Sequence, residues 1–182
     1  HGRVLLAVQE LEARPKLIAD AGFMYAAKMC GQSPEYDLFT PDAGELAFLA
    51  DEKAPHPFYT RGFILSEEYK VPSLITRAFA HSNAAAYLLV KGRTDYVANS
   101  SGILATVDAP ADEAMEAVGG TGDTLTGVVS SLIESGLEVP RAAELAARIN
   151  RTAGSISHPT PASQIMDIIP CLPEAYELIK NN

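Results

Sequence analysis

The sequence predicts an α/β protein in which helices flank a layered sheet, and three observations favour this fold class. Short apolar runs that end in turn residues alternate with stretches whose apolar residues recur every three or four positions. The continuous apolar run AAAYLLV is typical of a strand that is buried on both faces. Hydrophobic residues make up 47% and charged residues 20% of the 182 residues, so a single domain over 1–182 with its own core is expected.

The first part of the chain alternates predicted strands and helices. Residues 14–20, RPKLIAD, predict a strand because an apolar run lies between a proline and an aspartate. Residues 21–30 suit a helix, which Gly31 would end. A short strand is expected at 36–40, and after a proline turn a helix opens near Ala43–Glu45.

The middle of the chain predicts a loop, a helix and then three strands. Residues 55–70 are aromatic and irregular, which indicates a loop or a lid-like insertion. A helix is expected over 72–81 because proline suits the first helical turn. The apolar run within 84–92 predicts the clearest strand, and 94–99 and 102–108 predict a hairpin or meander after it.

The last part of the chain predicts helices. Apolar residues at i, i+3, i+4, i+7 and i+8 mark one face of a helix that Gly136 would end: Leu125, Val128, Val129, Leu132 and Ile133. Pro140 opens a further helix, and proline-punctuated short helices close the chain.

Charge and cysteine content narrow the partners and the compartment. Fourteen basic residues against 23 acidic ones give a net charge of −9 without a Lys/Arg cluster, so nucleic-acid binding is not expected. No apolar run is long enough for a membrane-spanning helix. Cys30 and Cys171 stand far apart without a CxxC pattern, which favours free thiols in a reducing cytosol, and we expect a cytoplasmic protein.

The stretch 117–136, AVGGTGDTLTGVVSSLIESG, places glycines directly before a predicted helix. Gly119, Gly120 and Gly122 allow a phosphate to approach backbone N–H groups at the positive end of that helix. The pattern is neither a Walker A loop nor the Rossmann fingerprint. Asp123 would repel a bare phosphate, but it suits a base that takes a proton from the hydroxyl attacking the phosphate. The alternative is that Asp123 only caps the helix.

Other polar residues each have a catalytic and a plain interpretation. Asp20 ends a predicted strand, where the sites of α/β proteins gather, or it is a satisfied surface carboxylate. Glu45 complements a helix dipole, or it serves a magnesium or phosphate-water role. Lys91-Gly92 alone marks a strand end and a turn. No paired histidine spacing predicts a protein-only metal centre, and no GxSxG elbow predicts a serine hydrolase.

Several segments together resemble one family. GGTGDTLTGVVSSLIESG is similar to the glycine–aspartate signature of the ribokinase-like superfamily, with the best match to ADP/ATP-dependent NAD(P)H-hydrate dehydratases. KLIADAG, LFTPDAGELAFL and AYLLVKGRTDYVANSSG resemble further family segments in the same order, and AARINRTAGSI resembles the closing helix. The resemblance covers nearly all of the chain and implies the C-terminal two-thirds of a ribokinase-like domain, truncated at its N-terminus.

The resemblance implies a site and its ligands. Asp123 would act as base on a hydroxyl that is phosphorylated and then eliminated, with ADP or ATP and Mg²⁺ as cofactors. Asp20, Asp42 and Glu45 would bind a small-molecule substrate. The residues that would line the adenine nucleotide are Lys91, Gly92, Arg93, Thr94, Asp95, Gly120, Thr121 and Gly122.

The chain departs from the family in its TPHPGE segment, where Asp42 and Ala43 replace a histidine and a proline. A donor has become a carboxylate, so a small-molecule kinase is an alternative to the dehydratase. A nucleotide-binding or interaction module without catalysis is a second alternative. A homo-oligomer is expected, because an exposed sheet edge favours edge pairing.

Overall fold

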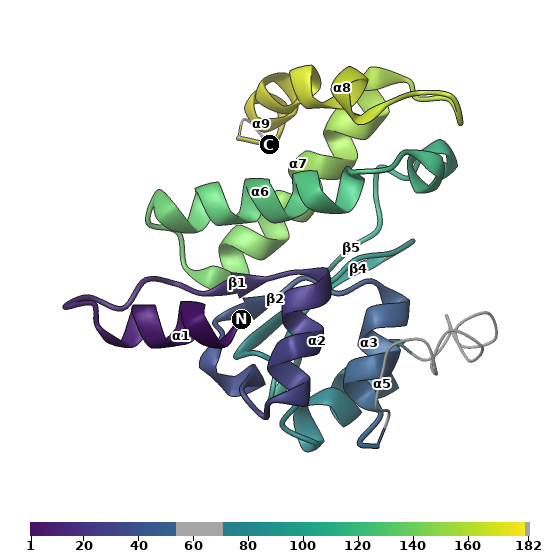
Figure 1. Ribbon diagram of the computed structural model, residues 1–182. Coiled ribbons are helices and arrows are strands. Elements are labelled where there is room, and N and C mark those ends of the chain that lie inside the picture. The colour runs from purple at the N-terminus through teal and green to yellow at the C-terminus, as the bar shows by residue number, and fades with distance from the viewer. Residues whose placement is uncertain (54–70, 181–182) are drawn as a thin grey trace. The chain divides into compact units, whose positions relative to one another are not determined.

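The computed structural model describes residues 1–53 and 71–180, which fall into two compact units (Figure 1). The first unit comprises residues 1–92 and 96–104, and the second comprises residues 93–95 and 105–182. The insertion expected at 55–70 lies outside the described residues. The expectation of a single domain over 1–182 stays a prediction.

A five-stranded sheet has the strand order β1-β2-β3-β4-β5. β1 pairs with β2 and β2 with β3 in parallel, whereas β3 and β4 are antiparallel. The parallel strands therefore bring their carboxyl ends to one edge of the sheet in the first unit, where ligand sites of α/β folds gather. The strands are β1 Ile18–Ala19, β2 Leu38–Phe39, β3 Tyr87–Val90, β4 Asp95–Asn99 and β5 Gly102–Val107.

β1 is shorter than the strand predicted at 14–20, because the Asp37 side chain takes over hydrogen bonding there. The Leu17 N–H donates to the Asp37 carboxylate at 2.8 Å, and Lys16 and Arg14 each approach it at 3.0 Å. Burial alone would raise the pKa of Asp37, but the Leu17 N–H and the two cations hold it below its ordinary value.

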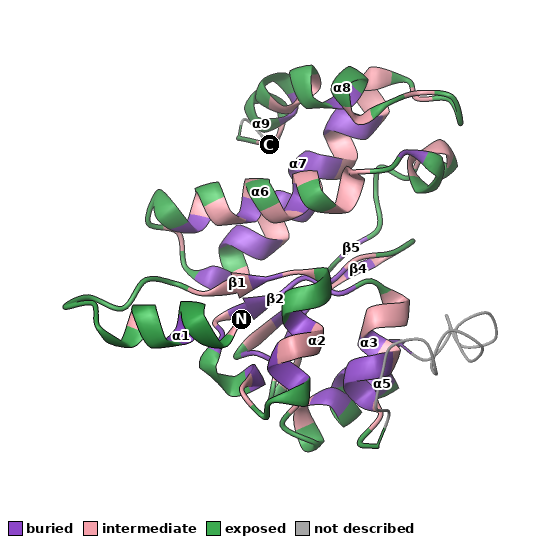
Figure 2. Cartoon of the chain, viewed as in Figure 1, coloured by how far each residue is buried: buried purple, intermediate pink, exposed green. Residues whose placement is uncertain are grey.

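Helices cover one face of the sheet in the first unit. Figure 1 shows α2, α3 and α5 on that face, which confirms the helices predicted from 21, 43 and 72. α1 was not predicted: its residues are mostly exposed (Figure 2), and only Leu5 is buried. The helical segments are α1 Gly2–Gln9, α2 Ala21–Met29, η1 Ser33–Glu35, α3 Ala43–Ala50 and α5 Val71–Ala80.

The ends of α2 follow local rules. Asp20 caps its N-terminus, accepting the Ala21 N–H at 3.0 Å. Gly31 follows its last turn with φ +66°, a left-handed conformation that glycine adopts without a steric penalty. The aspartate and the glycine read from the sequence therefore set the two limits of this helix.

Lys28 of α2 is buried and holds the C-terminal end of α3. Its ammonium donates to the backbone carbonyls of Phe48 and Asp51, and it lies 3.9 Å from the centroid of the Phe48 ring. Burial lowers the pKa of Lys28, while the Asp51 carboxylate raises it. The lysine thus adds a charged donor to carbonyls at the end of the helix.

The second unit is helical around its own core. Buried residues of this core come from α7, α8, α9 and the residue that follows η4, Val118, and α6 and α7 lie side by side (Figure 1). The helix predicted after the glycine cluster and the one opened by Pro140 are both present. The helical segments are η4 Glu113–Ala117, α6 Thr121–Glu134, α7 Val139–Ser157, α8 Ile165–Ile168, η5 Ile169–Cys171 and α9 Leu172–Lys180.

The apolar face of α6 differs from the predicted one. Leu125, Val129 and Ile133 are buried, one turn apart on the same side of the helix. Val128 and Leu132 are only half-buried, and they pack against the core of the second unit from the neighbouring side. The five predicted residues therefore lie on two faces of α6: three are buried, and Val128 and Leu132 line a pocket that is described below.

Candidate functional site

Asp20 and Lys91 form an ion pair at the carboxyl edge of the parallel strands. Asp20 follows β1 and Lys91 follows β3, and the ammonium lies 2.9 and 3.1 Å from the two carboxylate oxygens. Their side chains are 18% and 17% exposed. The sequence predicted Asp20 for substrate and Lys91 for nucleotide. The pairing means that a ligand reaching either group also meets the other.

Asp42 and Glu45 lie at the start of α3 and form a capping box. The Glu45 N–H donates to Asp42 Oδ1 at 2.7 Å, and the Asp42 N–H donates to Glu45 Oε2 at 2.9 Å. An isolated parallel bridge joins Asp42 to Lys91, so the end of β2 lies beside the end of β3. The capping box is a sufficient structural role for Asp42 and Glu45. Their carboxylate oxygens nevertheless lie near the same edge of the sheet.

Tyr25 of α2 completes this group, and the sequence did not point to it. Its hydroxyl donates to Glu45 Oε1 at 3.2 Å, and its ring packs edge-on to Phe48 with centroids 5.3 Å apart. Burial raises the pKa of Glu45; the Asp42 N–H lowers it, and the neighbouring Asp42 and Asp20 carboxylates raise it while Lys91 lowers it. Perturbed carboxyls at a strand edge are typical of functional sites.

The glycine turn of the second unit begins α6 as the sequence predicted. Gly120 is the N-terminal cap with φ 98° and ψ −4°, a left-handed conformation. A Cβ at this position would lie 3.2 Å from two atoms of Ile165, so glycine is needed for shape as well as for conformation. The first amides of α6 lack intrahelical acceptors and sit at the positive end of the helix dipole. This is the geometry of an anion site.

Asp123 lies in the first turn of α6 and is exposed. The cap position belongs to Gly120, so Asp123 does not occupy the N-cap that the plain interpretation assigned to it. Its carboxylate is therefore presented to solvent beside amides that can hold a phosphate.

Asn150 of α7 forms a hydrogen bond to the first residue of α6, at the same turn. Its side-chain amide donates to the Thr121 carbonyl at 3.3 Å, and the residue is 9% exposed. The Asn150 Oδ1 atom has no hydrogen-bond partner in the described part of the chain. No local sequence pattern predicts this contact, because 29 residues separate the two partners.

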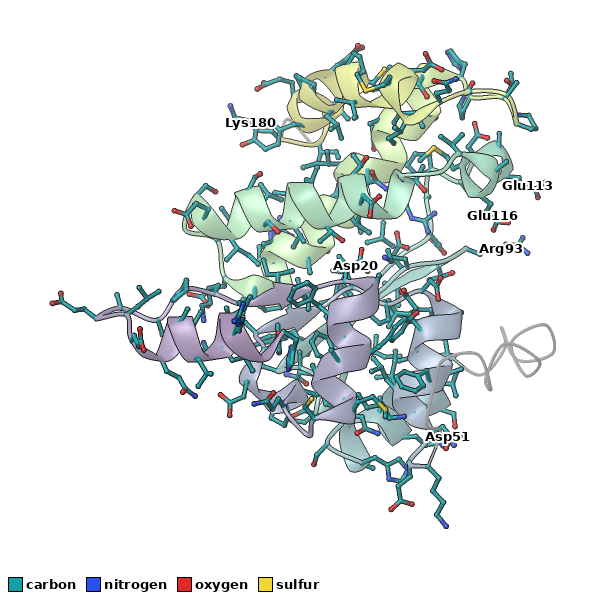
Figure 3. All side chains as sticks on the ribbon, in the orientation of Figure 1. Asp20, Asp51, Arg93, Glu113, Glu116 and Lys180 are labelled. Carbon is teal, nitrogen blue, oxygen red and sulfur yellow. The ribbon has the colours of Figure 1, made fainter. Side chains whose placement is uncertain are left out.

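Arg93, Thr94 and Asp95 belong to the second unit, whereas Lys91 and Gly92 belong to the first. Asp95 is buried, and its carboxylate accepts from Arg151 of α7 at 2.7 Å. Arg93 is exposed, and its side chain points away from the ribbon (Figure 3). The predicted nucleotide-binding segment therefore combines an exposed cation with a buried, paired carboxylate.

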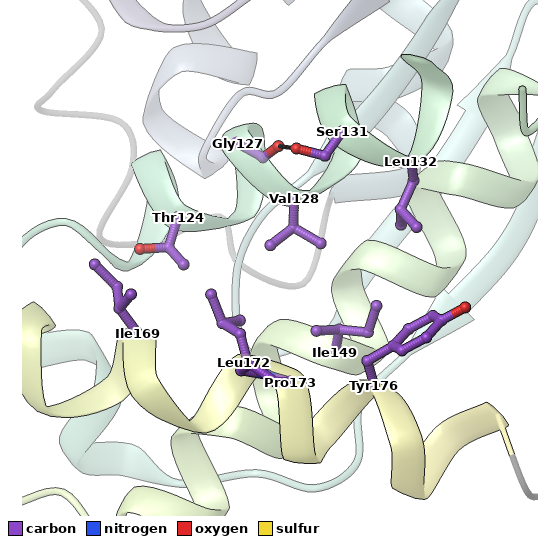
Figure 4. A pocket seen from close by; sticks show the side chains of 10 residues that line it. All are labelled: Thr124, Gly127, Val128, Ser131, Leu132, Ile149, Ile169, Leu172, Pro173 and Tyr176. Atoms are coloured by element: carbon purple, nitrogen blue, oxygen red, sulfur yellow. Dashed lines mark hydrogen bonds between the residues drawn. The ribbon is translucent and has the colours of Figure 1, made fainter. Parts of the chain in front are cut away.

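A pocket of about 480 Å³ lies within the second unit, between α6, α7 and the segment η5–α9 (Figure 4). It is mainly apolar, and Thr124, next to Asp123 in sequence, lies at one end. None of the predicted site residues lines it. The lining residues are Thr124, Gly127, Val128, Ser131, Leu132, Ile149, Ile169, Leu172, Pro173 and Tyr176.

Within residues 1–53 and 71–180, no three His, Cys, Asp or Glu side chains gather to hold a metal ion. Mg²⁺ is usually bound through one or two carboxylates together with the phosphates of a nucleotide. The carboxylates of Glu45 and Asp42 fit that mode.

In the same part of the chain, no helix combines the length and the apolarity needed to cross a membrane.

The model of the NAD(P)H-hydrate dehydratase family matches residues 3–169. The chain belongs to this family. An uncharacterized protein of Methanocaldococcus jannaschii is 47% identical over 171 residues, which are 93% of this chain and 74% of that protein. The bifunctional NAD(P)H-hydrate repair enzyme Nnr of Hyperthermus butylicus is 37% identical over 91 residues, 48% of this chain and 16% of the enzyme.

Solved structures show the fold. Pyridoxal kinase of Entamoeba histolytica matches with a TM-score of 0.64 at 18% identity, covering 96% of this chain and 62% of the kinase. Ribokinase of Cryptococcus neoformans matches with a TM-score of 0.61 at 13% identity, covering 96% of this chain and 55% of that enzyme. The predicted ribokinase-like α/β fold is thereby confirmed, and the chain spans less than two thirds of each kinase.

Proposed function

We propose that this chain is an adenine-nucleotide-dependent NAD(P)H-hydrate dehydratase. The observation that carries the proposal is the turn from Gly120 to Asp123, which combines phosphate-binding amides with an exposed carboxylate at one helix start. The family match supplies the reaction class. Positioning and charge stabilisation are the means by which such sites transfer phosphoryl groups.

In the proposed reaction, Asp123 accepts a proton from the substrate hydroxyl. The hydroxyl oxygen of the hydrate attacks the terminal phosphorus of ADP or ATP, and the bond from that phosphorus to the leaving nucleotide breaks. Asp123 takes the hydroxyl proton, while the amides at Gly120–Gly122 hold the transferred charge. The C–O bond then breaks with phosphate as the leaving group, the adjacent carbon releases a proton to solvent, and the C=C bond forms again, so the substrate loses the elements of water.

The remaining candidate residues take binding roles. In the second unit, Arg93 would engage phosphate oxygens of the nucleotide. In the first unit, Lys91 would engage phosphate oxygens, and Glu45 and Asp42 would supply carboxylates to a Mg²⁺ ion that is bound to phosphate. Asp20 would hold a substrate hydroxyl and share Lys91 with the ligand. These roles follow the family resemblance and agree with the charges of the described groups.

A matched pair of variants on α6 tests the proposal. Asp123→Asn removes the base but keeps the shape, so turnover of NADH hydrate falls about 10²–10⁴-fold, the range for general-base catalysis. The dissociation constant of ADP changes only a few-fold. Glu134→Gln makes the same chemical change at the other end of the helix and leaves turnover intact. Equal turnover in both variants would refute the role of Asp123.

A small-molecule kinase is the second candidate, and Asp42 is the observation that favours it. A carboxylate stands where the family has a histidine, and it suits a polyhydroxylated substrate as a hydrogen-bond acceptor. Transfer of phosphate to a stable organic product, with no free phosphate, would select this candidate. A chain that binds nucleotide without turning over any substrate would instead be a binding module.

We further propose a cytoplasmic homo-oligomer. The compartment is proposed because both Cys30 and Cys171 are free thiols, as is usual in a reducing cytosol. The net charge of −9 opposes nucleic acid as a partner. The oligomer is proposed because an exposed sheet edge favours pairing between copies of the chain. Light scattering after size-exclusion chromatography measures the assembly directly. A mass equal to that of one chain would contradict the oligomer.

A further inference from the structure

Arg151 joins three pieces of the second unit through one half-buried guanidinium. Its Nε donates to Asp95 Oδ2 at 2.7 Å, its Nη2 to the Arg93 carbonyl at 2.9 Å and its Nη1 to the Pro110 carbonyl at 3.4 Å. The side chains of Arg151 and Asp95 are 12% and 8% exposed. Helix α7 is thereby tied to the first residue of β4 and to the turn before it.

The tie acts where the sheet offers no support. The recorded pairing between β3 and β4 ends at Val90 and Tyr96, and residues 92–94 form the turn that leads into β4. Arg151 binds the backbone of this turn at Arg93 and the side chain of Asp95, the first residue of β4. A planar guanidinium presents several donors in a fixed fork, so it fixes a direction as well as a distance.

The turn presents an exposed cation. Arg93 is exposed and its side chain points away from the ribbon (Figure 3), while its own carbonyl is the atom that Arg151 holds. Fixing the carbonyl limits the backbone conformations of Arg93 and so the directions its guanidinium can take. A preorganised cation loses less entropy when it binds an anion than a mobile one does.

We infer that Arg151 is a positioning residue for the nucleotide's phosphates, acting through the backbone of Arg93, and that Asp95 serves the site as the anchor of Arg151. The inference rests on the proposed function, since it assumes that Arg93 meets a phosphate. Asp95 then contributes without contacting the ligand. Its carboxylate also compensates the buried charge of Arg151.

The test measures dissociation constants of ADP and of adenosine by calorimetry for the whole chain. Arg151→Lys keeps the positive charge but loses the fork, so the ADP constant rises about tenfold while the adenosine constant stays within twofold. Arg93→Ala causes the same ADP-specific loss. Arg141→Met is the matched control on α7, because Arg141 is exposed and pairs with Glu144 of its own helix.

A double variant distinguishes positioning from a structural role. If Arg151 acts through Arg93, then adding Arg151→Lys to Arg93→Ala produces no further loss of ADP affinity. Additive losses, or equal losses for ADP and adenosine, would overturn the inference. Should Arg151→Lys fail to fold, Asp95→Asn replaces it in the same cycle, because the amide keeps the size of the side chain.

The same measurements separate this inference from the proposed function. Wild-type protein that binds neither ADP nor ATP would refute both. Wild-type binding with an unchanged ADP constant in Arg151→Lys would refute the inference alone and leave the dehydratase proposal standing.

Discussion

Replacing Gly120 by alanine should destabilise the glycine turn far more than the same change one residue earlier. Gly120 has φ +98°, and an added Cβ would lie 3.2 Å from Cβ and Cγ1 of Ile165. At Gly119, an added Cβ would have no atom of the described residues within 4 Å apart from its neighbours in the chain. The two substitutions remove the same freedom from the unfolded chain, so their difference reports the folded turn.

The size of the effect follows from two costs. Holding alanine at a positive φ costs about 1–3 kcal/mol. Ile165 must also move, and because its branched side chain is stiff, this adds about 1 kcal/mol. A total of about 2–4 kcal/mol corresponds to a fall in Tm of roughly 5–15 °C for a chain of this size.

Thermal unfolding followed by circular dichroism measures both variants against the wild type. Gly119→Ala should lie within about 2 °C of the wild type, as expected for a surface change within ±0.5 kcal/mol. Equal Tm values for Gly119→Ala and Gly120→Ala would refute the left-handed turn and its contact with Ile165.

Three further predictions concern the first unit. Lys28→Met removes the ammonium that donates to the Phe48 and Asp51 carbonyls and lowers the free energy of unfolding by about 1–3 kcal/mol, measured in urea; an unchanged value would contradict the capping role. Asp37→Asn lowers stability at pH 7, but this difference from the wild type shrinks as pH falls below 3.8, because the folded pKa of Asp37 is depressed. The pKa of Glu45 is raised in the folded protein, so the free energy of unfolding of the wild type declines as pH rises above 4.5 toward that folded pKa. Glu45→Gln removes the contribution of this carboxyl to the decline. Parallel pH profiles of stability for the wild type and Glu45→Gln would contradict the raised pKa.

Local signals predicted the helix starts well. Asp20 and Asp42 stand directly before helices, and both cap them as such residues do. Gly120 likewise begins α6 where the sequence placed a phosphate-binding turn. These features depend on a few adjacent residues, so a single sequence contains the information for them.

Contacts between distant residues could not be predicted in this way. Asp20 and Lys91 are 71 residues apart, and Asp95 and Arg151 are 56 apart. Their pairing depends on strand order and helix packing, which no local pattern specifies. Tyr25 was missed for the same reason, because an aromatic residue in a helix is more often a core residue than a partner for a carboxylate.

The limits of the apolar pattern explain the remaining differences. Val128 and Leu132 follow the helical period of α6 but line a pocket, because the period fixes a side of the helix and not the neighbour that covers it. α1 lacks a side-chain cap and buries only Leu5, so neither of the usual helix signals was present.

The most direct test of the central claim is a product balance with wild-type protein, ATP, Mg²⁺ and NADH hydrate. The proposed dehydratase releases NADH, ADP and inorganic phosphate in equal amounts, and the rate of all three falls about 10²–10⁴-fold in Asp123→Asn. Formation of ADP and phosphate without NADH, or of a phosphorylated organic product without free phosphate, would contradict the claim.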